Sequence, residues 1–130
     1  MKKPKILILK IEEHLHETML NGELKELGET YEVVLASSIV DAFDKIAKAK
    51  LIENDPIRAI IFQRKTLVAS EEKCRVVAQF AEYYYDKHLV AINMLSNDQD
   101  SEARDWAVSA NYCKSNNWEY LQLILDTNIK

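Results

Sequence analysis

The sequence predicts an α/β domain built on a doubly wound, five-stranded parallel sheet flanked by five helices. Short apolar runs rich in β-forming residues alternate with amphipathic stretches of helical length, and several of these runs are almost continuously apolar, as in strands covered on both faces. Because parallel strands need crossover helices, five strand–helix repeats in 130 residues favour one parallel sheet. We therefore expect residues 1–130 to form a single domain, since this length suits one core and is too short for two.

The expected strands are short, and the first, third and fourth are the most continuously apolar. Functional residues of such sheets collect at the carboxyl ends of the strands, so those ends are the places to look for chemistry. In chain order the expected strands are Ile6–Leu9, Tyr31–Ala36, Ala59–Phe62, Val90–Leu95 and a weaker run around Asn111–Cys113.

The expected helices are recognised by apolar stripes at helical spacing and by polar residues that cap their first turns. The first is weakened by Asn21-Gly22 in its middle. In chain order they are a stripe from Leu15 to Leu27, Ile39–Leu51 capped by Ser37 or Ser38, Glu71–Lys87 capped by Ser70, a stretch after Asn97-Asp98 with Ala103, Trp106 and Ala107, and a helix that starts near Asn117.

Composition narrows the function classes. Hydrophobic residues make up 48% and charged residues 29%, which is typical of a folded globular protein. The net charge is −4 and the lysines are scattered, so the basic patch of a nucleic-acid binder is missing. No apolar run approaches the roughly 18 residues that span a bilayer, so no membrane association is expected. Cys74 and Cys113 form no CxxC pair, and without a secretory signal we expect reduced thiols and a cytoplasmic location.

Four segments resemble the receiver domain of response regulators in two-component signalling, in order and over the whole chain. The resemblance implies a flavodoxin-like fold and implies that the strand ends correspond to a phosphorylation site. The four segments are KILILKIE (Lys5–Glu12), RAIIFQ (Arg58–Gln63), NMLSN (Asn93–Asn97) and SEARDWAVSANYCKS (Ser101–Ser115).

The chain departs from the receiver pattern at the residues that carry the chemistry. Lys10 and Ile11 stand where the family has an acidic pair that holds Mg²⁺, and Gln63 stands where it has the aspartate that accepts the phosphoryl group. A hard cation takes oxygen ligands, and an amide cannot form an acyl phosphate. Shifting the first strand by two residues offers Glu12 and Glu13 as the pair but restores no acceptor. We therefore expect no phosphorylation, no Mg²⁺ binding and no cofactor.

Two receiver positions are kept in part. Ser96 matches the hydroxyl that contacts the phosphoryl group, and Lys114 resembles the lysine that pairs with it. Tyr112 and Lys114 are two residues apart where the family has three, and Ser115 replaces a proline. The fifth strand can therefore be aligned with the receiver pattern in registers that differ by one residue.

Lys10 changes the electrostatics of the pocket that corresponds, by the resemblance, to the receiver phosphorylation site. Near Lys114 it would place two like charges where a divalent cation should bind. The favoured interpretation is an ion pair of Lys10 with Glu12 or Glu13 that fills the vacated pocket. The alternative is an anion site formed by Lys10, Ser96 and Lys114.

Aromatic residues mark candidate interfaces. Tyr83, Tyr84 and Tyr85 span about 200° of a helix surface, so one helix face cannot bury all three. We expect Tyr84 to be in the core and Tyr83 and Tyr85 to be partly exposed, where tyrosine is suited to protein contact. Trp106 and Tyr112 lie near the fourth helix and fifth strand, which resemble the surface receivers use for dimerisation or partner contact; a core position for Trp106 fits the sequence equally well.

No catalytic set is visible. His14 and His16 point to different faces of a helix start, so solvated histidines are favoured over a metal site. Neither a G-x-S-x-G turn nor a glycine-rich phosphate loop is present. The sequence thus predicts a pseudo-receiver that is not an enzyme and acts on a protein partner or as a homodimer. The alternative is a small-ligand or anion sensor that uses the vacated pocket.

Overall fold

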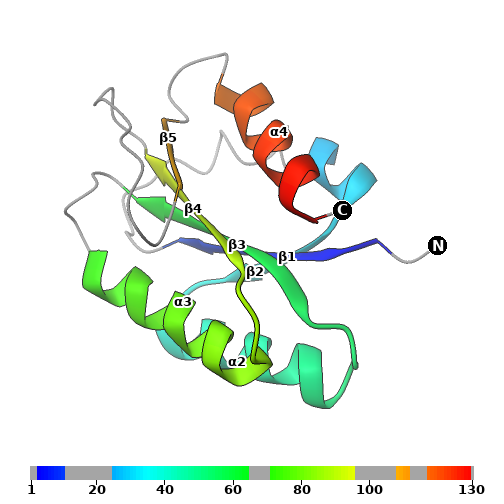
Figure 1. Cartoon of the computed structure of the whole chain (residues 1–130), viewed down its shortest axis with the longest axis vertical. Coiled ribbons are helices and arrows are strands. Elements are labelled where there is room, and N and C mark those ends of the chain that lie inside the picture. The colour runs from blue at the N-terminus through cyan, green and yellow to red at the C-terminus, as the bar shows by residue number, and fades with distance from the viewer. Residues whose placement is uncertain (1–2, 11–24, 65–70, 96–107, 112–116, 130) are drawn as a thin grey trace.

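The computed structural model describes residues 3–10, 25–64, 71–95, 108–111 and 117–129 (Figure 1). Residues 25–30 are helical and precede the second strand. The strands are β1 (Lys5–Lys10), β2 (Glu32–Ala36), β3 (Ile57–Arg64), β4 (Val90–Leu95) and β5 (Val108–Asn111), and the labelled helices are α2 (Ile39–Leu51), α3 (Glu71–Tyr85) and α4 (Asn117–Ile129).

The five strands form one sheet in the order β2-β1-β3-β4-β5, and every neighbouring pair is parallel. This is the strand order of flavodoxin-like sheets, in which the order reverses between β1 and β3. The expected parallel α/β architecture is therefore confirmed. The expected fourth helix lies outside the described residues.

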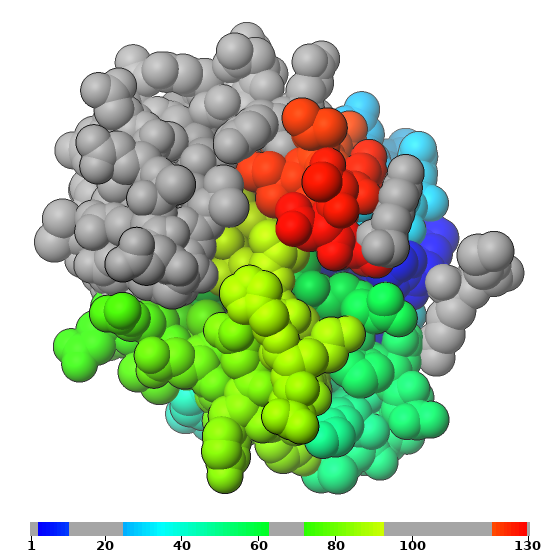
Figure 2. Space-filling model, in the orientation of Figure 1, coloured from blue at the N-terminus to red at the C-terminus, as the bar shows by residue number. Residues whose placement is uncertain are grey.

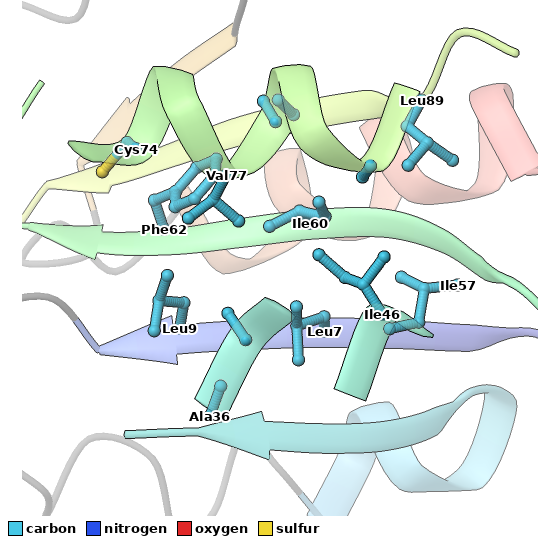
Figure 3. Packing of buried hydrophobic residues seen from close by; sticks show 14 of the residues in the cluster. Leu7, Leu9, Ala36, Ile46, Ile57, Ile60, Phe62, Cys74, Val77 and Leu89 are labelled. Carbon is cyan, nitrogen blue, oxygen red and sulfur yellow. The ribbon is translucent and has the colours of Figure 1, made fainter. Parts of the chain in front are cut away.

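Helices cover both faces of the sheet, and alternate residues of each central strand feed the two cores. Leu7 and Leu9 of β1 pack with Ile60 and Phe62 of β3 on the face that α2 and α3 cover, and Figure 3 shows Phe62 and Val77 meeting between β3 and α3. The alternate residues of β1 and β3 point to the opposite face of the sheet, where they form a second core beneath helical residues 25–30 and α4. Members of that second core are Ile6, Ile8, Leu27, Ala59, Ile61, Ile92, Leu121, Ile124 and Leu125.

Helix α2 begins as the sequence predicts. Of the two serines offered as its cap, Ser38 is the N-cap: its Oγ accepts a hydrogen bond from the backbone N–H of Asp41 at 3.0 Å. The Asp41 carboxylate in turn accepts from the Ser37 backbone N–H at 3.1 Å and from Lys45 Nζ at 3.1 Å. These hydrogen bonds, led by the one from Ser37, hold the pKa of Asp41 below its usual value. The interlocked contacts fix the turn that follows β2.

Several boundaries differ from the sequence prediction: β1 and β3 extend one or two residues further at each end, β2 begins one residue later, and β5 and α3 are also shifted. The fifth strand was expected around Asn111–Cys113, but β5 occupies Val108–Asn111, because its register pairs Val108 with Ile92 and Asn111 with Leu95. Helix α3 was expected to reach Lys87 but ends at Tyr85. There Asp86 takes a left-handed φ of 55°, and the Lys87 backbone N–H bonds the Glu82 carbonyl at 3.2 Å, as at many helix C-termini.

Candidate functional site

The carboxyl ends of β1 and β3 lie side by side at the point where the strand order reverses. Lys10 is in register with Gln63, and the next strand places Met94 beside Gln63 and Leu95 beside Arg64. In Figure 1 the arrowheads of β1, β3 and β4 point to this same edge of the sheet. Ligands of open parallel sheets bind at this position, so it is the candidate site.

The sheet brings together two residues of the predicted pocket. Lys10 is partly buried at the end of β1, and the backbone of Gln63 lies next to it. Ile11, Ser96 and Lys114 lie outside the described residues, as do Glu12 and Glu13. The ion pair expected for Lys10 and the anion site with Ser96 and Lys114 therefore stay predictions.

The strand ends at this edge carry no carboxylate in the part of the chain that the structure describes. The five described strands end in Lys10, Ala36, Arg64, Leu95 and Asn111. Within the same residues, no group of three or more His, Cys, Asp and Glu side chains is placed to hold a metal ion.

The exposure of the three consecutive tyrosines of α3 differs from the sequence prediction. Tyr83 is 87% exposed, as expected, whereas Tyr84 is only partly buried. Tyr85 is in the core with 9% of its surface exposed, so its place among the interface candidates is wrong. The reason is helical spacing: Tyr85 continues the buried row of Cys74, Ala78 and Ala81. This row was visible in the sequence. The other two interface candidates, Trp106 and Tyr112, lie outside the described residues.

The Tyr85 hydroxyl is bonded inside the core. It donates to the Ile46 carbonyl of α2 at 2.7 Å and accepts from the Ile57 backbone N–H of β3 at 3.3 Å. Burial, together with the nearby Tyr84 and Glu53, raises the pKa of Tyr85 to about 12. Tyr85 therefore joins two helices to a strand and is not available for a partner.

Helices α2 and α3 are joined by a row of aromatic rings. The rings of Phe43 and Phe80 have centroids 4.6 Å apart, and the ring of Phe80 stacks on that of Tyr84 at 5.5 Å. Lys50 Nζ lies 5.0 Å from the Tyr84 ring centroid and donates to the Tyr84 carbonyl at 2.8 Å. A lysine from α2 thus places a positive charge at the C-terminus of α3, where it interacts favourably with the helix dipole.

A charged cluster that the sequence prediction missed lies at the opposite, amino-terminal edge of the sheet. Lys5 is 2% exposed, and its Nζ lies 2.7 Å from Glu53, 3.6 Å from Glu32 and 3.9 Å from Asp55. Burial lowers the pKa of Lys5, but the hydrogen bond to Glu53 and the three negative charges outweigh it and raise the pKa. The sequence signal was a lysine directly before an apolar strand.

Comparison with known proteins bears on the fold alone. No protein-family profile and no curated protein matches the chain. The crystal structure of a fragment from Peptoclostridium difficile 630, provisionally named a lipoprotein, is similar to it with a TM-score of 0.55. The two chains share 18% identity over 99% of this chain and 100% of the other, a level that shows a similar fold. Among the described residues, none of the helices combines the length and apolar character needed to cross a membrane.

Proposed function

We propose that this chain is a pseudo-receiver: a receiver-like signalling domain that acts by protein contact without being phosphorylated. The observation that carries the proposal is the pairing of Lys10 with Gln63 at the β1/β3 strand ends. In the receiver family these positions hold an acidic Mg²⁺ ligand and the phosphoryl acceptor. A cationic residue beside an amide supplies neither a metal ligand nor a carboxylate nucleophile.

The architecture supports the same proposal. The strand order β2-β1-β3-β4-β5 is the flavodoxin-like order that receivers share, and five helices around the sheet would complete the receiver fold. Retention of this scaffold without the reactive residues leaves surface recognition as the activity. We place the domain in the cytoplasm, where receiver domains operate, and we expect no enzymatic turnover. The neighbour's lipoprotein name supports no different role, because the likeness is one of fold.

The test is intact-mass spectrometry after incubation with acetyl phosphate and Mg²⁺. We expect no mass gain of one phosphoryl group, since the acceptor is an amide. A control receiver domain with an intact acidic pair and aspartate, treated in parallel, must show the gain. A stable phosphoryl group mapped to the β1 and β3 strand ends would overturn the proposal.

A further inference from the structure

Among the described residues, large apolar side chains that are exposed lie on helices or directly after one, except for Leu35 of β2, which is 50% exposed. Figure 2 shows one of these helices, α3, in light green at the surface of the molecule. A helix bonds most of its own backbone groups, whereas a strand at the edge of a sheet presents a row of N–H and C=O groups to any strand that approaches. β2 stands at one end of the described strand order. Its outer edge is therefore a place where a further strand could add.

The direction of the backbone groups along β2 follows from one hydrogen bond. The Glu32 backbone N–H donates to the Pro4 carbonyl at 2.9 Å, directly before β1, so the backbone groups of Glu32 face β1. In a parallel ladder the direction alternates from residue to residue. The groups of Val33, Leu35 and the following Ser37 therefore face away from β1, toward the outer edge.

Two side chains of α2 occupy the end of this outer edge. Lys45 Nζ donates to the Leu35 carbonyl at 2.6 Å, and the Asp41 carboxylate accepts from the Ser37 backbone N–H at 3.1 Å. Lys45 Nζ and the Asp41 carboxylate also lie 3.1 Å apart, so the two contacts hold each other. Hydrogen bonds that involve a charged group are stronger than those between neutral backbone groups. An incoming strand would have to displace them to use the Leu35 carbonyl.

The pairing that these contacts oppose is an antiparallel pair of two β2 strands about a two-fold axis. With the axis at Val34, Val33 of each copy faces Leu35 of the other, and each facing pair exchanges two hydrogen bonds. Both exchanges require the Leu35 carbonyl, which Lys45 holds in each copy. The strand Glu32–Ala36 is otherwise suited to such pairing, because its middle is β-branched and apolar and its one charge lies at its start.

From these contacts we infer that the Asp41–Lys45 pair is an autoinhibitory contact, which keeps the outer edge of β2 from pairing with β2 of a second copy of this chain. Lysine at an exposed strand edge is one of the means by which proteins prevent strand addition. Here the lysine comes from the helix that follows the strand and reaches back to its backbone. The inference goes beyond the proposed function and does not depend on it, since phosphorylation concerns the ends of β1 and β3.

Sedimentation velocity of the full chain over a range of concentrations tests the inference. Lys45→Met keeps the length of the side chain and removes the ammonium group. We expect its self-association to be at least about tenfold stronger than that of the wild type, because pairing no longer breaks a charged hydrogen bond in each copy. Lys48→Met removes an exposed lysine of the same helix, paired with Asp44 at 3.0 Å, and should associate like the wild type. A Lys45→Met chain that associates no more strongly than Lys48→Met overturns the inference.

Two further measurements place the association at the β2 edge. In associated Lys45→Met, the backbone amides of Val33 and Leu35 should become protected from hydrogen exchange. Adding Leu35→Pro removes an N–H that faces outward and takes no part in pairing with β1, so it should return association to the wild-type level. Leu35→Ala, added to Lys45→Met in the same way, keeps the N–H and should leave association in place.

Association of Lys45→Met without protection of these two amides overturns the inference, as does association that survives the proline in a folded chain. Thermal melts followed by circular dichroism show whether each variant folds. If the proline variant does not fold, the exchange measurement on Lys45→Met decides by itself.

Discussion

The Tyr85 hydroxyl of α3 donates a hydrogen bond to the Ile46 backbone carbonyl of α2 at 2.7 Å. The same oxygen accepts from the Ile57 backbone N–H at the start of β3. The two helices on this face and the strand beneath them therefore meet at one buried side chain. Tyr83, two residues earlier in the same helix, is 87% exposed, so these two tyrosines have unrelated roles.

Tyr85→Phe should lower the free energy of unfolding by about 1–2 kcal/mol, because it leaves the buried Ile57 N–H without the hydroxyl. Urea unfolding followed by circular dichroism measures the change. Tyr83→Phe is the matched control, and we expect its effect to stay within about 0.5 kcal/mol since that ring is exposed. Equal effects of the two substitutions would show that the buried hydroxyl adds nothing to stability.

The strands and helices of this fold were predictable where hydrophobic periodicity is strong. Helix α2 was expected at Ile39–Leu51, where the structure has it, and β4 at Val90–Leu95 likewise. The strand β5 was placed too late because Val108-Ser109-Ala110 has little apolar character of its own, and its position depends on pairing with β4.

The candidate site was less predictable than the fold. The adjacency of Lys10 and Gln63 follows from the sheet order, which local pattern alone does not fix. The Lys5 cluster was missed because its partners come from two distant points of the chain, Glu32 at the start of β2 and Glu53 with Asp55 in the connection between α2 and β3. Contacts of such long sequence separation leave no local signature.

Lys5→Met should destabilise the domain by on the order of 2 kcal/mol, because it removes a buried positive charge that lies within 4 Å of the carboxylates of Glu32, Glu53 and Asp55. The raised pKa means that Lys5 stabilises the fold at pH values below about 10, and that this contribution is lost as the pH rises through the folded value. Unfolding in urea at pH 7 measures the loss. Lys48→Met removes an exposed pair with Asp44 and should cost less than about 0.5 kcal/mol. A Lys5 variant no weaker than the Lys48 variant would contradict this account.

Stability should fall at alkaline pH because two buried tyrosines must keep their protons. Burial raises the pKa of Tyr31, and the hydrogen bond of its hydroxyl to Asp126 raises it further. The unfolded chain releases these protons near pH 10, which lowers the free energy of the unfolded state before that of the folded state, so stability declines above that pH. Tyr31→Phe should be less stable at pH 8, since it loses the bond to Asp126, but its decline between pH 9 and about pH 11 should be shallower. A decline of unchanged slope would show that Tyr31 ionises equally in both states.

The loss of phosphorylation should need two substitutions to reverse. Lys10→Asp restores one acidic residue at the end of β1 but leaves the amide of Gln63, so we expect a folded domain that acetyl phosphate does not label. Lys10→Asp combined with Gln63→Asp places two carboxylates in register and should bind Mg²⁺ weakly, measurable by titration calorimetry. Lys10→Asp combined with Asn111→Asp puts the second carboxylate at the end of β5 and is the matched control. Labelling of the single Lys10→Asp variant would mean that the acceptor lies at a residue other than Gln63.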